Sequence, residues 1–320
     1  MPGPPLVLGA LDPSAPSPFG RHSIVRRMVA QPVTALLVQR ALVMEVAHPA
    51  VAAGVEHHSR FRAHPLSRAW VTVDAGLRLV FGDDHVARGA VRQIYRVHDH
   101  INGNADPGRS GHPSAAGDTH GGAPRPTGVA APYSAHDASL LTWVWATLVD
   151  TTEVAFTRWV RPLTPAEVSS YYAEMRAFGR FLGIPDALLP ADRPALARYV
   201  SAMVDDEHLG SSTESRALAR QVLWFRHWSV PPALVRLERV LALATLDPRL
   251  ADRLELVPSP ADAALGRRLD ALLATHYRRL PRFPSVVPGL YVRLRRPSIG
   301  LAARIGVGPT RRPPSASAGA

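Results

Sequence analysis

His98 stands on a helix face that otherwise carries small or apolar residues. Between residues 86 and 101 such residues recur every three or four positions, which is the spacing of one buried helix face. The face comprises Ala87, Val91, Ile94, Val97 and Ile101. A buried imidazole must form a hydrogen bond or bind a metal, because an unpaired buried polar group costs about 1–3 kcal/mol. Two interpretations of His98 follow: a core histidine that donates to a carbonyl, and an axial ligand of haem iron.

A second group of titratable side chains is packed into residues 39–68. It comprises Glu45, His48, Glu56, His57, His58 and His64. Glu45 and His48 are three positions apart and therefore share a helical face. The HExxH spacing of a helical zinc site is missing from this segment. Two interpretations stay open: a carboxylate–histidine metal site, and a helix that ends at His48-Pro49 with histidines on the surface beyond it.

Arg68 and Thr72 form a third candidate, one helical turn apart in an apolar segment. An arginine beside an apolar stripe can bind a carboxylate with two parallel hydrogen bonds, and a haem propionate is such a carboxylate. The alternative is a surface arginine with an ordinary neighbour four residues away.

The composition excludes several classes of chemistry. The chain contains no cysteine, so disulfides, iron–sulfur clusters, thiolate-ligated haem and cysteine-rich zinc sites are all absent. All 37 basic residues are arginine, so there is neither a lysine Schiff base nor a P-loop lysine. Any metal must be bound by His, Asp, Glu or Tyr.

The net charge of +11 belongs mainly to the C-terminal end. Residues 271–320 carry nine arginines and no acidic residue, so subtracting nine from +11 leaves +2 for the rest of the chain. A nucleic-acid partner is therefore not expected. The arginines alternate with apolar residues, which predicts either a peripheral contact with an anionic membrane or a segment packed along the domain with solvated guanidinium groups.

Targeting signals are missing from the sequence. No apolar run reaches the roughly 18–20 residues that a membrane-spanning helix needs. The proline-rich N-terminus lacks the basic region of a signal peptide, so we expect a cytoplasmic protein that could associate with a membrane through its basic end.

Helical patterns dominate, and the predicted fold class is all-α, with a single helical domain. Helices are expected at residues 23–58 (one or two), 66–81, 84–101, 139–160, 165–182, 191–204, 213–229, 231–244 and 260–276. Asp84 is the expected cap of its helix, and Thr164, Pro165 and Glu167 form a strong helix start. The domain comprises residues 23–276, with a Gly- and Pro-rich disordered insertion at 103–132. It lies between a disordered segment 1–22 and a basic Pro/Arg-rich segment 277–320.

Four blocks of the sequence occur in the order found in one oxygenase family. They are QRALVMEVAHPAVAAGVEHHSRFRAHPLSR, LRLVFGDDHVARGAVRQIYRVHDHI, YSAHDASLLTWVWATLVDTTEVAF and RPLTPAEVSSYYAEMRAFGRFLGIP. Together they resemble the bacterial branch of the family of the oxygenase MpaB and the catalytic domain of rubber oxygenase (latex-clearing protein). The resemblance covers about residues 23 to 240.

The resemblance implies an all-helical fold with a globin-like core that binds haem b. It also implies that His98 is the iron ligand, that Arg68 and Thr72 lie on or near the opposite haem face, and that a distal glutamate is the catalytic base. Glu56 is the candidate for that base. The implied reaction uses O2 on a small apolar organic substrate, and oxidative cleavage of an alkene is its type.

Two positions depart from the family pattern. Val71 stands where rubber oxygenases carry a lysine, and Trp145 stands where bacterial relatives often carry a histidine. These departures keep one alternative open, a catalytically silent haem-binding or haem-sensing protein. The arginine-rich end keeps another open, a cofactor-free helical interaction protein that binds nucleic acid through it.

Overall fold

The computed structural model describes residues 14, 16–58, 65–105, 131–281, 284, 288, 289 and 292, with only the backbone described for residues 65–70, 104, 105, 131 and 132. The elements are α1 (Ile24–Val29), η1 (Pro32–Leu37), α2 (Val38–Ala47), α3 (Pro49–His58), α4 (Pro65–Phe81), α5 (Asp84–His98), β1 (Asn102–Ala105), β2 (Ala131–Ser134), α6 (Ala138–Trp159), α7 (Pro165–Phe181), η2 (Asp186–Leu188), α8 (Arg193–Asp205), α9 (Thr213–Leu223), α10 (Pro232–Thr245), α11 (Pro248–Arg253), α12 (Pro260–His276) and η3 (Tyr277–Arg279). The predicted all-α class is confirmed.

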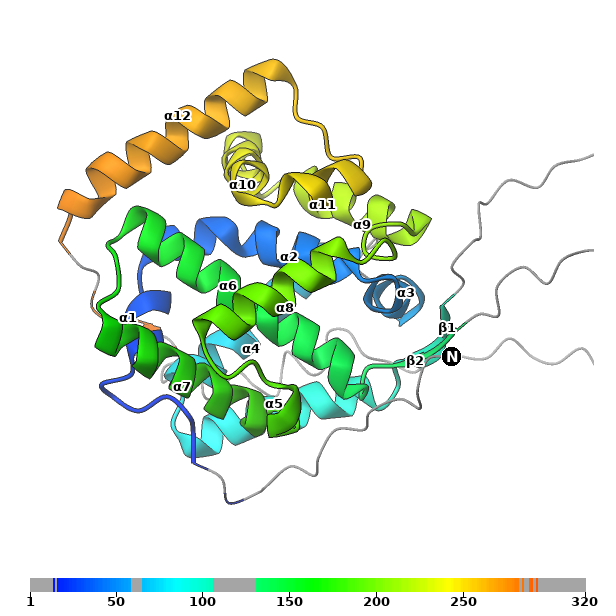
Figure 1. Ribbon diagram of the computed structural model, residues 1–320, viewed down its shortest axis with the longest axis vertical. Helices are drawn as coiled ribbons and strands as arrows, with labels where there is room; N and C mark the ends of the chain where they lie inside the picture. Colours follow the sequence, from blue (N-terminus) through cyan, green and yellow to red (C-terminus); the bar gives the residue numbers. More distant parts are fainter. Residues whose placement is uncertain are drawn as a thin grey trace, which may run out of the picture.

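Helix α6 is the centre of the bundle (Figure 1). Its buried residues are spread around the whole circumference, as in a helix that is enclosed by neighbours. Trp143, Trp145 and Trp159 are among the largest side chains that are completely buried. The helices that pack against α6 include α2, α7, α8 and α12.

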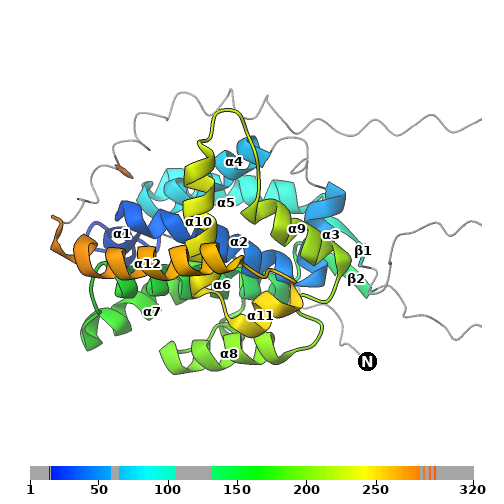
Figure 2. The same cartoon turned by 90° about the horizontal axis from the view of Figure 1, so that it is seen from above.

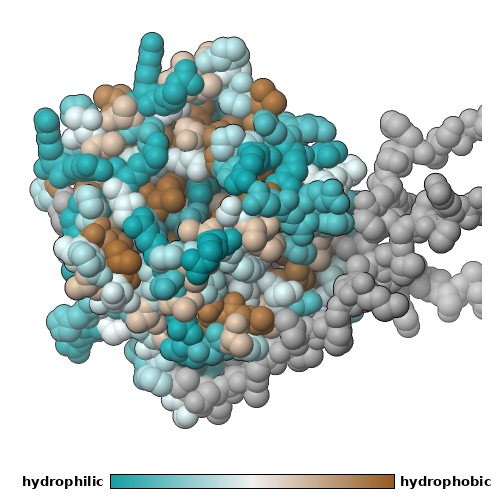
Figure 3. All heavy atoms as spheres, viewed as in Figure 1, coloured by the Kyte–Doolittle hydropathy of each residue, from teal (hydrophilic) through white to brown (hydrophobic). Residues whose placement is uncertain are grey.

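The face with α7 and α8 shows small apolar patches scattered among hydrophilic side chains (Figure 3). Helix α4 and the loop between α9 and α10 lie on the opposite side from α8 (Figure 2).

A sharp bend separates α2 from α3. His48 ends α2, and Pro49 begins α3 at an angle of 101°. The last carbonyl groups of α2 have no partner within the helix, and other segments satisfy them. The indole N–H of Trp143 donates to the Met44 carbonyl, and Gly210 N–H and Ser215 Oγ donate to the Ala47 carbonyl. The bend is therefore held by tertiary hydrogen bonds.

No single helix among the described residues has the length and apolar character to cross a membrane, although the bent pair Pro32–Ala47 and Pro49–His58 meets both criteria when taken together.

Several helix boundaries differ from the sequence predictions. Asp83, and not Asp84, caps α5, because its side chain accepts a hydrogen bond from Val86 N–H. Helix α9 ends at Leu223, six residues before the predicted end at 229. The short helix α11 follows Asp247, whose side chain caps it, and it was not predicted.

The β1–β2 hairpin was also not predicted. Its strands are four residues long and pair antiparallel, with Asn102 opposite Ser134 and Ala105 opposite Ala131. Four residues are too few to show alternation, and the partners are far apart in sequence. The expected disordered insertion therefore has paired strands at both ends, while residues 106–130 lie outside the described residues.

The expected terminal segments contain packed residues. Phe19 is buried in the main core, where its ring centroid lies 5.4 Å from that of Phe178. The expected disorder of residues 1–22 is therefore wrong for this part, because Phe19 finds an aromatic partner on α7. Val292, within the basic segment, packs with Ala30, Phe81 and Val86.

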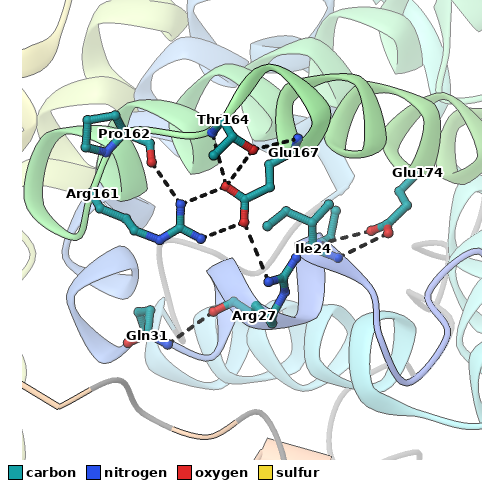
Figure 4. A network of polar contacts seen from close by, with 9 residues as sticks. Ile24, Arg27, Gln31, Arg161, Pro162, Thr164, Glu167 and Glu174 are labelled. Carbon is teal, nitrogen blue, oxygen red and sulfur yellow. Dashed lines mark hydrogen bonds and ion pairs between the residues drawn. The ribbon is translucent and has the colours of Figure 1, made fainter.

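Helix α7 begins at the predicted capping box. Thr164 Oγ1 accepts a hydrogen bond from Glu167 N–H, and the Glu167 carboxylate accepts one from Thr164 N–H. Arg161 binds the same carboxylate with two hydrogen bonds of 2.6 and 2.7 Å (Figure 4). This arginine lowers the pKa of Glu167 to about 2.

About two turns further along α7, Glu174 fixes the N-terminus of α1 (Figure 4). Its carboxylate accepts hydrogen bonds from Ser23 Oγ at 2.6 Å and from the N–H groups of Ile24 and Val25 at 3.1 Å. A carboxylate at this position satisfies free N–H groups and opposes the positive end of the helix dipole.

We therefore expect Glu174→Gln to destabilise the protein by about 1–3 kcal/mol, because a neutral amide replaces a charged acceptor of three hydrogen bonds. Chemical denaturation at neutral pH measures this change. Glu207→Gln, at an exposed loop position, is the control and is expected to stay within about 0.5 kcal/mol of the wild type. Equal stability of the two variants would contradict the capping role.

Candidate functional site

Helices α4 and α5 form a hairpin that carries the predicted site residues Thr72 and His98. Gly82 allows the turn between the helices, since a Cβ atom there would lie 2.3 Å from the Arg78 carbonyl oxygen. Arg78 donates a hydrogen bond of 2.7 Å to Gln93 across the pair. Thr72 and His98 therefore belong to two helices that pack against each other.

His98 is the last residue of α5 and is half-buried. Its Nδ1 atom is completely shielded from solvent. The predicted stripe is buried at Ala87 and Val91 but only partly buried at Ile94, because α5 leaves the core towards its C-terminus. His98 thus lies at the edge of the core, and the prediction of a fully buried face is wrong at this end.

A second histidine lies beside His98. The ring centroid of His136, just before α6, is 6.0 Å from that of His98 in an edge-to-face arrangement. His136 Nε2 is 2.8 Å from the Asp99 carboxylate, and the Tyr95 ring centroid lies 5.2 Å from the His136 centroid. Sequence reasoning missed His136, whose only signal was its place in the YSAHDAS part of the third family-like block.

The C-terminal end of α3 meets the residues that follow His98. His57 Nδ1 lies 3.1 Å from the Tyr133 hydroxyl, and His58 Nε2 lies 3.0 Å from the Asn102 carbonyl oxygen. A Cβ atom at Gly54 would lie 3.3 Å from Ile101, so the two segments touch closely. Glu56 is half-buried on the same helix end. The fold thus places the end of α3, which carries the predicted base, against the residues that follow His98.

The residues predicted on α4 have different surroundings. Thr72 is exposed, and its neighbours Val71 and Val73 are exposed to 41% and 37%. Successive helix positions point about 100° apart, so this part of α4 is open in several directions. Arg68 belongs to α4, but its side chain lies outside the described residues.

Glu45 on α2 and His48, which caps the end of that helix, both have pKa values shifted by burial. Burial raises the pKa of Glu45 to about 8, and a hydrogen bond with Thr147 on α6 opposes this shift only in part. Burial also lowers the pKa of His48, against the opposing charges of Asp206 and Asp137. At neutral pH the Glu45 carboxyl is therefore mostly protonated and can donate a proton.

The described part of the chain contains no group of three His, Asp or Glu side chains arranged for a metal ion. The second interpretation of residues 39–68 predicted a helix that ends at His48-Pro49 and histidines on the surface beyond it. The structure has this helix end, and His57 and His58 are exposed. His64 lies outside the described residues.

Two cavities lie elsewhere in the bundle. One of about 390 Å³ is lined by leucines of η1, α10 and α12 together with His276 and Tyr277. The other, of about 190 Å³, lies over Glu153, Tyr172 and Arg193. Neither is lined by His98, Thr72 or Glu56.

An all-helical bundle with a histidine at the edge of its core is compatible with an oxygenase. The family model described as ER-bound oxygenase mpaB/B'/Rubber oxygenase, catalytic domain, matches residues 26–275. The chain belongs to this oxygenase family, as the four sequence blocks predicted. The match continues beyond the predicted limit of residue 240 to the end of α12. No curated protein and no solved structure compared with the chain gave a match.

The buried carboxyl of Glu45 predicts a pH-dependent stability. The folded-state pKa of about 8 is above the ordinary value of 4.5, so the stabilising contribution is complete below pH 4.5 and is lost as the pH rises through about 8. We expect Glu45→Gln to remove this loss, which has a maximum slope of about 1.4 kcal/mol per pH unit.

Denaturation curves of both proteins from pH 4 to pH 9 measure the effect. The variant should gain stability relative to the wild type across this window, and the difference should be constant below pH 4.5. Parallel curves over the whole range would contradict the protonated, buried state.

Proposed function

We propose that this protein is a haem b-dependent oxygenase that uses O2 on a small apolar organic substrate, with oxidative cleavage of an alkene as the reaction type. Membership of an oxygenase family supports the general class. The observation that carries the haem assignment is the position of His98, a half-buried imidazole at the end of α5, the helix that packs against α4.

The residues around His98 fit a haem group. Haem iron in many proteins takes one imidazole nitrogen as its axial ligand, and a chain without cysteine offers no thiolate in its place. The remainder of a haem needs apolar surface and a few cations for its propionates. Val71 and Val73 supply exposed apolar surface on α4, the helix that packs against α5, and Arg68 precedes them on the same helix.

Each residue would then have a distinct task. His98 would hold the iron, and Arg68 would pair with a propionate or orient the base. Thr72 would offer a hydroxyl group to the site, and the Glu56 carboxylate would accept a proton from the substrate. When bound, haem supplies the reductive activation of O2 that no side chain of this protein can perform. The helix ends around His98 exclude water and orient the substrate.

Other parts of the proposal come from the sequence alone. A cytoplasmic location is one of them, and a contact between residues 277–320 and an anionic membrane is another. The burial of Val292 favours the other interpretation of residues 277–320 at this position, in which the segment packs along the domain.

A catalytically silent haem protein is the second candidate, and Trp145 is the observation that favours it. Where bacterial relatives often carry a histidine, this indole is completely buried and donates its N–H to the Met175 carbonyl at 2.7 Å. The side chain is therefore part of the core and provides no titratable group to a reaction.

We expect the protein purified with haem, or reconstituted with haemin, to show a Soret band that His98→Ala abolishes or shifts. The loss of the axial imidazole should also weaken haem binding by at least about tenfold. His100→Ala is the matched control, since this exposed imidazole lies only two residues away and contacts the Arg96 carbonyl. A protein that stays colourless after reconstitution would exclude both haem functions.

Oxygen consumption separates the two candidates. The oxygenase should consume O2 in proportion to an added alkene and form two carbonyl products, and Glu56→Gln should slow this reaction by about 10²-fold or more while the Soret band remains. A haem-loaded protein that binds O2 but consumes none with a broad panel of apolar substrates would identify the silent alternative.

A further inference from the structure

The loop between α9 and α10, residues 224–231, projects from the side of the molecule opposite α8 (Figure 2). Trp228 in this loop is 93% exposed. Indole is the largest apolar side chain, so leaving it in water forgoes a large hydrophobic gain. The folding of the chain by itself gains nothing from leaving this side chain in water.

The loop is an ordered turn. Ser229 N–H donates to His227 Nδ1 at 3.2 Å, and Val230 N–H donates to the His227 carbonyl at 3.1 Å. The His227 and Trp228 ring centroids are 5.7 Å apart. At the base of the loop, the guanidinium of Arg239 lies 5.0 Å from the Trp224 ring centroid. The turn therefore holds Trp228 outward.

Other apolar side chains lie around this turn. Trp224 and Leu234 flank it and are each 41% exposed. The exposed Val71 and Val73 belong to α4, which lies on the same side of the molecule as the loop (Figure 2). Single exposed apolar residues are ordinary on protein surfaces, whereas a gathering of them marks an interaction site.

The charge around the loop is positive. The chain has no acidic residue between Glu214 and Glu238, and Arg226 is exposed in the loop itself. The arginines beside the loop outnumber their acidic partners, because two arginines share each carboxylate. Arg216 and Arg220 both pair with Glu255, and Arg236 and Arg239 both pair with Asp262. An anionic surface complements this face.

We propose that the α9–α10 loop is an interfacial anchor that places this side of the protein on an anionic lipid surface, with Trp228 inserted among the headgroups and Arg226 against their phosphates. Tryptophan prefers the membrane–water interface because its ring is apolar and its N–H is polar. A projecting turn enters a soft lipid surface, whereas a stable protein interface needs a broad complementary area. This anchor does not depend on haem binding. It also brings the open part of α4 towards the phase in which apolar substrates dissolve.

Flotation with lipid vesicles tests the anchor. The full-length protein should bind vesicles of phosphatidylglycerol and phosphatidylcholine more strongly than vesicles of phosphatidylcholine alone, and added salt should weaken the first interaction. Trp228→Ser should lower the partition coefficient at least about tenfold, because it removes the indole that inserts among the lipids. Val257→Ser, at a valine that is 76% exposed on the α11–α12 loop, is the matched control and should bind as the wild type does.

Fluorescence measures the insertion directly. Lipids brominated on the acyl chain should quench part of the tryptophan emission of the wild type, and Trp228→Phe should lose that part. The proposal is overturned if the wild type does not bind anionic vesicles, or if Trp228→Ser binds them unchanged. Loss of binding only when the arginines of residues 278–312 are replaced by glutamine would place the contact in the basic segment and also overturn it. Conversion of an oligomer to a monomer by Trp228→Ser, without any vesicle binding, would identify a contact between copies of the chain instead.

Discussion

The buried N–H groups of three indoles on α6 determine how the other helices are arranged. Each finds its acceptor on a different helix: Trp143 on the Met44 carbonyl of α2, Trp145 on the Met175 carbonyl of α7, and Trp159 on the Asp270 carboxylate of α12. A buried N–H without an acceptor would cost about 1–3 kcal/mol, so these three helices must lie where their oxygens reach α6. The central helix thus specifies both the apolar packing and the orientation of its neighbours.

The same helix connects the core to the candidate site. Asp137 caps its N-terminus, so the preceding residue, His136, is fixed at the end of α6. That position places His136 beside His98 and Tyr133 beside His57. The site at the end of α5 is therefore assembled from segments whose places are set by the burial of α6.

Local signals made much of the fold predictable, and long-range contacts account for the rest. Thr164 starts α7 because its cap partner is three residues away, within the range of a sequence pattern. The hairpin joins strands whose pairing depends on contacts across a long insertion, so no local pattern indicates it. In the site, periodicity located His98, but His136 reaches it only through folding. The raised pKa of Glu45 comes from its burial in the folded bundle, and the hydrogen bond that opposes the shift comes from Thr147, about a hundred residues away, so neither could be inferred from its neighbours in the sequence.

The β1–β2 hairpin determines where the length of this chain can vary. Because Ala105 and Ala131 are paired, the chain leaves the bundle and returns to it at the same point. The segment between them can change in length without altering the distance that the helices must span, and the entropy of closing a longer loop grows only slowly with its length. Insertions there are tolerated by the fold, yet they emerge next to the residues that follow His98. Evolution, or a protein engineer, can thus change what surrounds the site while the helical scaffold stays the same.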